Sequence, residues 1–107
     1  MIPMTDVRDN TDAHRFELEI EGQTAVAIYN LSGHNLMITE VLVPPPVEGR
    51  GVAGRLMQRA VAEAEARDML ILPVCPYASA WLRKHPDHAD VVHPTWRAML
   101  GLSPAPQ

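Results

Sequence analysis

The sequence predicts an α/β domain with a mixed, mainly antiparallel sheet. Three observations support this: strand-like alternation over the first forty residues, a glycine-rich loop followed by helical periodicity, and a short apolar run after that helix. A strand–helix–strand connection of this kind places its two strands parallel. A chain of 107 residues has room for one core. We therefore expect one domain over residues 14–102, a flexible segment over 1–13 and a tail over 103–107.

Charge and composition exclude several classes of partner. The formal net charge is −4 and no basic run is present, which argues against general nucleic-acid binding. Neither a leader-like start nor an apolar run long enough to cross a bilayer is found, so we expect a cytoplasmic protein without a membrane partner. A single cysteine, Cys75, rules out an internal disulfide.

The first half of the chain predicts a β-meander. Residues 14–21 alternate apolar and charged side chains, and the short link Gly22-Gln23 joins them to a second strand over 24–31 in a hairpin. After a turn at 32–35, residues 36–43 form the most apolar strand, so we expect both its faces to be covered. The polar, aperiodic start is expected to lie loosely over a sheet edge.

The second half predicts a crossover helix, a central parallel strand and a short C-terminal helix. Apolar residues recur at helical spacing from Val52 to about Arg67, and residues 69–74 form a buried strand parallel to the third. Pro76 suits the first turn of a helix that ends near Lys84, before Pro86. Residues 87–102 supply one last strand or helical turn.

The loop at Gly49, Gly51 and Gly54 has the composition of a phosphate-binding cradle. Glycine permits close backbone approach, and the helix that follows presents unpaired N–H groups at the positive end of its dipole. The spacing matches the dinucleotide fingerprint literally. However, the next strand ends in Val-Cys-Pro without an acidic residue, and too little chain follows for a doubly wound sheet.

A second interpretation is that these glycines only form a tight turn and let the helix pack closely. The arginines argue against it. Arg50 lies within the loop, and Arg55 and Arg59 follow on the helix, where a cation opposes the dipole unless an anion is bound. The loop is therefore expected to hold a small anionic ligand.

The chain resembles the GNAT superfamily of acyltransferases, and in particular a group of very small, single-domain GNAT-like proteins. The superfamily loop pattern, Gln/Arg-x-x-Gly-x-Gly/Ala, falls on Glu48, Gly51 and Ala53, with a carboxylate at its first position that we expect to cap the loop. Three stretches carry the closer likeness, residues 44–53, 70–77 and 85–92, in the same order. The resemblance covers residues 14 to 93.

The resemblance implies an N-acetyltransferase that moves the acetyl group of acetyl-CoA to a primary amine by direct attack on the thioester. It implies no metal, an acceptor that is a small molecule or a peptide lysine, and a monomer or homodimer. A CoA-binding sensor or carrier without turnover is the alternative, followed by a subunit with no cofactor. The residues expected to bind the cofactor are Val41, Val43, Gly49, Arg50, Gly51, Val52, Ala53, Gly54, Arg55, Cys75, Pro76 and Trp81.

Three residues are candidates for catalysis. Glu40 stands where the small group carries a histidine, and it serves as general base if burial raises its pKa, or is otherwise a surface carboxylate. Cys75, before a helix N-terminus, is either a nucleophile or a packed, cofactor-lining thiol. Trp81 takes the place of the superfamily's acidic tyrosine, which leaves Tyr77 as the hydroxyl on that helix, with core packing as its other role.

Three histidines, His85, His88 and His93, suggest a metal site by composition alone. Pro86 breaks the helix that would align the first two, and no cysteine partner is at hand. We expect instead that His85 caps the helix C-terminus and that His88 is exposed.

Overall fold

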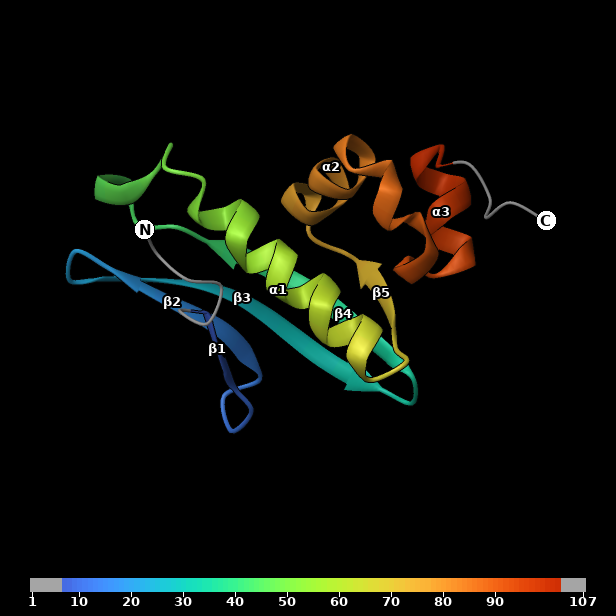
Figure 1. Ribbon diagram of the computed structural model, residues 1–107, viewed down its shortest axis with the longest axis horizontal. Coiled ribbons are helices and arrows are strands. Elements are labelled where there is room, and N and C mark those ends of the chain that lie inside the picture. Colours follow the sequence, from blue (N-terminus) through green and yellow to red (C-terminus); the bar gives the residue numbers. More distant parts are fainter. Residues whose placement is uncertain (1–6, 103–107) are drawn as a thin grey trace.

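The computed structural model describes residues 7–102 as a two-layer α/β domain (Figure 1). Its sheet has the strand order β1-β2-β3-β4-β5, in which the first four strands are antiparallel and β5 is parallel to β4. The predicted mixed α/β fold is thereby confirmed. The elements are β1 (Val7–Asn10), β2 (Arg15–Ile20), β3 (Gln23–Ser32), β4 (Asn35–Leu42), α1 (Val52–Ala66), β5 (Leu70–Pro73), α2 (Pro76–Lys84) and α3 (Pro94–Leu100).

The meander follows the predicted alternation closely. Ile20 pairs with Gln23, so the two turn residues are Glu21 and Gly22, one position earlier than predicted, and both adopt positive φ. Such a turn matches the right-handed twist of the strands it joins. The helix α1 ends at Ala66 and α2 spans Pro76 to Lys84, both as the sequence indicates.

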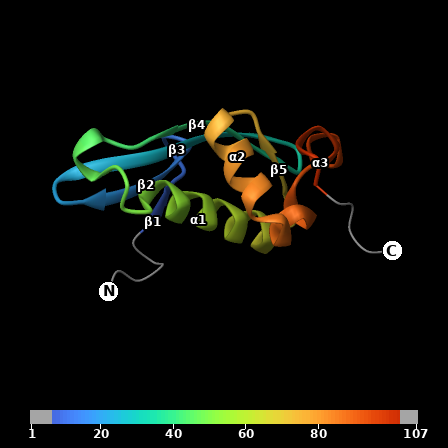
Figure 2. The same ribbon diagram turned by 90° about the horizontal axis from the view of Figure 1, so that it is seen from above.

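The core lies between the sheet and α1. Figure 2 shows α1 running along one side of the sheet. The apolar side chains of alternate strand positions belong to the same buried cluster as the apolar side chains of α1. Phe16 and Leu18 on β2 and Leu36 and Ile38 on β4 are fully buried on this side. The residues that α1 buries against them are Val52, Leu56, Met57, Ala60, Val61 and Ala64.

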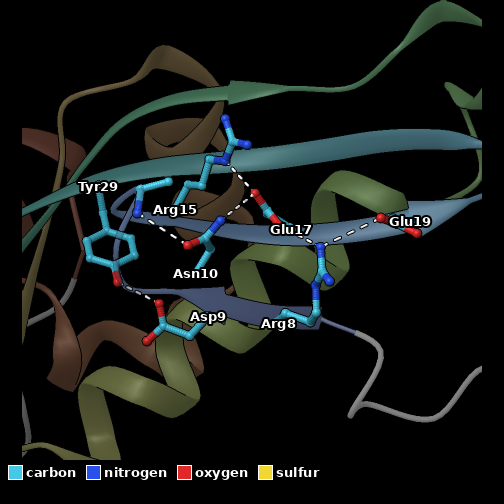
Figure 3. Close-up of polar contacts among 8 residues, drawn as sticks. Arg8, Asp9, Asn10, Arg15, Glu17, Glu19 and Tyr29 are labelled. Carbon is cyan, nitrogen blue, oxygen red and sulfur yellow. Dashed lines mark hydrogen bonds and ion pairs between the residues drawn. The ribbon is translucent and has the colours of Figure 1, made fainter.

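The opposite side of the sheet, which we call the open face, carries polar and partly exposed residues. Over β2 and β3 none of the helices within residues 7–102 covers it (Figure 2). A polar network on this face centres on Glu17, whose carboxylate accepts hydrogen bonds from Arg8 (2.7 Å), Asn10 (3.1 Å) and Arg15 (2.5 Å), as Figure 3 shows. These groups cover Glu17, which is buried.

The start of the chain is more ordered than predicted. Residues 7–10 form the edge strand β1, although residues 1–13 were expected to be loosely held. Val7 is buried, and its carbonyl oxygen accepts a hydrogen bond from Arg59 on α1. On the same strand Asp9 accepts a hydrogen bond from the Tyr29 hydroxyl at 2.5 Å (Figure 3). The expectations for residues 1–6 and 103–107 lie outside the described residues.

Two expectations about strand position were wrong. β5 is the last strand in the order rather than a central one, and beyond it, over the residues that the structure describes, a single bridge from Ile71 to Val92 continues the sheet. β4 does lie inside the sheet, but only one of its faces is covered, because Glu40 and Leu42 are exposed.

The C-terminal segment resolves the open choice between a strand and a helix. A 3-10 turn at Pro86–Val91 leads into α3, which begins at Pro94 with the His93 side chain accepting a hydrogen bond from the Thr95 N–H. Leu100 and Leu102 are buried and join the core.

Candidate active site

A cavity of about 570 Å³ lies where the glycine loop, the end of β4 and the start of α2 meet. This volume is in the range of about 300–1,000 Å³ that small-molecule and cofactor sites occupy. The residues that line it are Val41, Leu42, Val43, Glu48, Gly49, Gly51, Val52, Ala53, Gly54 and Tyr77.

The glycine loop forms one wall of the cavity. Gly49 has φ +80 and Gly51, the N-cap of α1, has φ +73, a left-handed conformation that glycine adopts without strain. A Cβ built at either position would have no heavy atom within 4 Å, so the loop presents open space rather than packed backbone. Among residues 7–102 no side chain caps the α1 N-terminus, and no acidic residue lies in its first turn, so an anion can bind the N–H groups there.

Gly54 has a different reason to be glycine. A Cβ at this position would lie 3.3 Å from the Trp81 indole nitrogen, which is closer than nine in ten Cβ contacts in proteins. The third glycine therefore lets α1 and α2 approach each other, as the packing interpretation holds, while Gly49 and Gly51 shape the loop. Trp81 itself is buried and lies outside the cavity lining.

A second wall is the free edge of β4. The pairing of β4 with β5 ends at Ile38 and Pro73, and the Ile38 carbonyl then accepts a hydrogen bond from the Cys75 N–H at 3.0 Å. Just beyond, Thr39 is an extra residue in the β3–β4 ladder, and its hydroxyl donates to the Ile28 carbonyl at 3.2 Å. Such a β-bulge bends the strand, and residues 39–42 have no strand partner on the β5 side within the described part of the chain.

The strand residues that line the cavity carry side chains on both faces of the sheet. Val41 and Val43 pack against the core on the α1 side. Leu42 pairs with Val26, which pairs with Glu17, so Leu42 belongs to the open face. Positions 41–43 all line the cavity, which therefore follows the edge of β4.

Of the three candidate catalytic residues, the structure brings only Tyr77 into the cavity lining. Tyr77 is in the first turn of α2 and 40% exposed; partial burial, followed by the neighbouring Cys75 thiol, raises the pKa of its hydroxyl above the ordinary value of 10.0. Cys75, the N-cap of α2, is buried in the core, and Glu40 is exposed on the open face, so the burial on which its role as base depended is missing.

The arginines of the loop region point elsewhere. Arg50 forms an ion pair with Glu21 of the β2–β3 turn, and Arg59 binds Glu63 at 2.8 Å and the Val7 carbonyl. Arg50, Arg55, Cys75 and Pro76 do not line the cavity. The Glu48 carboxylate is exposed in the cavity wall, and only its backbone N–H takes part in capping, by donating to the Pro45 carbonyl.

The histidines form an aromatic stack. The His85 ring lies 3.9 Å from that of Trp81, and its Nδ1 is 2.7 Å from the Trp81 carbonyl oxygen, so it caps the end of α2 as expected. His88 stacks further out at 5.7 Å and is half-buried rather than exposed. Within residues 7–102 no group of three or more metal-ligating side chains lies close enough to hold a metal ion.

The comparison with known families agrees with this architecture. A family model described as GCN5-related N-acetyl-transferase matches residues 15–91, which is most of the chain. The chain belongs to this family. None of the curated proteins searched matches it. Among the described helices of this GCN5-related protein, none is long and apolar enough to cross a membrane.

Sequence reasoning on this GCN5-related chain missed one cavity residue, Leu42. The sequence did carry a signal for it. Leu42 lies two positions after Glu40 in the last strand of the meander, so the two side chains are on the same, exposed face. Glu48 was noticed only as a departure from the loop pattern, although it too lines the cavity.

Proposed function

We propose that this protein is an acetyl-CoA-dependent N-acetyltransferase that transfers an acetyl group to a primary amine by direct attack on the thioester. One observation carries the proposal. A single cavity joins the uncapped N–H groups of α1, the unpaired edge of β4 and the hydroxyl-bearing ring of Tyr77. Family membership supports the reaction class, and the cavity supports these residues as its site.

The cavity residues fit the parts of acetyl-CoA. The pyrophosphate would bind the N–H groups of the loop and of the first α1 turn, where Gly49 and Gly51 leave room for it. The pantetheine arm, which carries two amides, would bind the backbone of β4 around Val41 and Val43 as an added strand does. The thioester would then lie toward Tyr77 and Leu42.

The chemistry needs little beyond positioning. A neutral amine attacks the thioester carbonyl, and a backbone N–H at the free edge of β4 would stabilise the oxyanion. The C–S bond then breaks and the thiolate leaves, with Tyr77 available to protonate it. Water, or Glu40 through a water, takes the proton from nitrogen. Direct attack does not require Cys75, which agrees with its burial.

A CoA-binding protein without turnover is the second candidate. Two observations favour it: Glu40 is exposed, and Trp81, which has no acidic proton to give, is buried outside the cavity. Calorimetric titration with acetyl-CoA tests the binding that both candidates share. A thiol-release assay over a panel of amines then separates them, because only the enzyme releases CoA.

The Gly51→Asp variant tests the location of the site. We expect it to weaken acetyl-CoA binding by about 100-fold, because a carboxylate would face the pyrophosphate across a few ångströms. The matched control is Gly33→Asp, since Gly33 also has positive φ and open space around it but lies in the β3–β4 turn. Equal affinities of the two variants in calorimetry would refute the assigned loop.

A further inference from the structure

We propose that two copies of this protein pair through their open faces and form a two-fold symmetric homodimer. The proposal concerns a second surface of the molecule and does not depend on the proposed acetyl transfer. Three observations support it. No described helix covers the open face over β2 and β3 (Figure 2), its middle is apolar, and its charged side chains make the face complementary to itself.

One row of side chains across the open face carries a cation at one end and an anion at the other. Ile28 on β3 pairs with Arg15 on β2 and with Glu40 on β4. Side chains that pair in this way lie about 5 Å apart, so Arg15 and Glu40 stand about 10 Å from each other with Ile28 between them. The row therefore carries a cation, an apolar residue and an anion on three neighbouring strands.

Both charges of this row are accessible from outside the molecule. Arg15 donates to Glu17 on the same strand, yet 42% of its side chain stays exposed. Glu40 is exposed, and among residues 7–102 no ion pair to it is formed. Glu40 can therefore accept an ion pair from another molecule, and the exposed part of Arg15 can supply one.

The middle of the open face is apolar. Val26 and Ile28 are successive open-face residues of β3, which is the third of the five strands in the sheet. Leu42 pairs with Val26 from β4 and is 47% exposed, and Ile28 is half-buried. An apolar centre flanked by polar side chains is the usual composition of a protein–protein interface.

A two-fold axis along β3 matches each charge of the row with its opposite. Rotation about this axis places β3 of one copy over β3 of the other, and β2 over β4. Arg15 of each copy then faces Glu40 of the other, so the contact occurs twice by symmetry. Sheets pack about 10 Å apart and within about 30° of alignment, a separation that an arginine and a glutamate side chain span together.

The same charges disfavour the other simple arrangement of two open faces. An axis along the row, at right angles to the strands, would place Glu40 over Glu40 and Arg15 over Arg15. Like charges that face each other in this way oppose association. The charge pattern thus selects the axis along β3.

The open face is large enough for a dimer of modest affinity. Strands lie about 4.8 Å apart and rise about 3.4 Å per residue, so five strands of four to ten residues offer roughly 500 Å² per copy. The total of about 1,000 Å² is at the lower limit for a specific interface. We therefore expect a dissociation constant in the micromolar range.

The pairing is compatible with the proposed cofactor site. α1 lies on the opposite side of the sheet, so the pairing does not cover it (Figure 2). Of the strand residues that line the cavity, Leu42 belongs to the open face, so the second copy would border the cavity at this residue. Absence of acetyl-CoA binding in calorimetry would overturn the proposed function and leave the homodimer proposal standing.

Sedimentation equilibrium of the full chain tests the pairing, over a range of about 1 µM to 1 mM that includes the expected affinity. We expect a monomer–dimer equilibrium. Glu40→Arg should raise its dissociation constant by about 10-fold or more, because two ion pairs become repulsive contacts. Glu65→Arg is the matched control, since it makes the same charge change at an exposed residue of α1 and should leave the equilibrium unchanged.

A charge exchange tests the orientation. Arg15→Glu alone should also weaken the dimer, whereas an equimolar mixture with Glu40→Arg should form a heterodimer, because each contact again joins opposite charges. Arg15→Glu also loses the bond to Glu17, so circular dichroism must show that it is folded. Glu40→Gln, which removes the charge without touching that bond, should weaken the dimer about 3-fold, less than Glu40→Arg does.

Three results would overturn the homodimer proposal and leave the proposed transferase intact. The first is a protein that stays monomeric at every concentration, which would leave the open face to a different partner. The second is a dimer that Glu40→Arg weakens no more than Glu65→Arg does. The third is a mixture of the two folded charge variants that stays monomeric.

Discussion

Tyr77 is the side chain on which the proposed chemistry depends most. It lines the cavity, and burial with the nearby Cys75 raises the pKa of its hydroxyl. A raised pKa keeps the phenol protonated throughout the neutral range, so Tyr77 can donate a proton and cannot act as a base, although the higher pKa also makes it a weaker acid. A thiolate is a good leaving group even without help, since thiol pKa values are about 8.5.

We therefore expect Tyr77→Phe to lower kcat by about 10-fold, which is less than the roughly 100- to 10,000-fold that proton transfer typically contributes, because the thiolate leaves readily without help. The affinity for acetyl-CoA should stay the same, because the ring is kept. Steady-state kinetics and calorimetry on the same preparation measure the two quantities. An unchanged kcat would show that Tyr77 only packs against the cofactor.

Single residues also show how far the sequence predicts this site. The glycine loop was predictable, because positive φ and a helix N-terminus leave a local pattern. The partners of the arginines were not: Arg59 binds the Val7 carbonyl, 52 positions away in sequence, and no local pattern records that contact. Leu42 was missed because its exposure depends on the bulge at Thr39 and on where β5 stops.

At the scale of elements, the strands were predicted where one side is buried, since alternation then follows from the pleat. β1 was missed because Val7 is its one apolar residue, and its remaining contacts are polar: Arg8 with Glu17 and Asp9 with Tyr29. The edge position of β5 was missed because an apolar run indicates that a strand is buried, but does not indicate which place the strand takes among its neighbours in the sheet. α3 was left open because Pro94 and the His93 cap lie in a short segment with little periodicity.

The Glu17 network is expected to make the attachment of β1 depend on pH. Hydrogen bonds from Asn10, then Arg15, lower the pKa of the Glu17 carboxyl below 4.5, although burial acts in the opposite direction. A carboxyl group whose pKa is lower in the folded than in the unfolded state stabilises the fold at pH values above its unfolded-state pKa. This stabilisation is lost as the pH falls through the folded-state pKa.

Glu17→Gln should accordingly reduce the free energy of unfolding at pH 7 by about 1 kcal/mol, since Arg8 and Arg15 are partly exposed and their interactions are screened. The difference in the free energy of unfolding between the unaltered protein and Glu17→Gln should shrink below pH 4.5. Urea unfolding followed by circular dichroism at several pH values measures it. A difference that stays constant down to pH 3 would mean that the carboxylate charge plays no part.

The whole molecule is larger than the segment that matches its family. The match covers residues 15–91, but β1 precedes it and α3 follows it. Both contribute to the one core, through Val7 on one side and Leu100 and Leu102 on the other. Residues 7–102 therefore pack around a single core that includes both ends of the described chain.

Shortening the chain to residues 15–92 should therefore destabilise it severely. Three buried side chains are lost, each of which contributes about 1.5–3 kcal/mol, and the sum approaches the roughly 5–15 kcal/mol of a typical domain. Urea unfolding should show a much lower midpoint than for residues 7–102, the matched control. Equal midpoints would show that the matched segment is an independent folding unit.

The interruption between β4 and β5 has one more consequence, for the behaviour of the protein in solution. A strand edge without a partner is where sheets of different molecules join and aggregate. Here the gap is bordered by residues that cannot donate a backbone hydrogen bond: Pro44, Pro45 and Pro46 follow β4, and Pro73 and Pro76 flank the end of β5. A strand from another molecule would meet prolines, which lack a backbone N–H donor, at both ends of the gap. A short, flexible ligand needs only the few backbone N–H and C=O groups of β4. We therefore expect these prolines to hinder pairing with another polypeptide more than binding of the proposed cofactor arm.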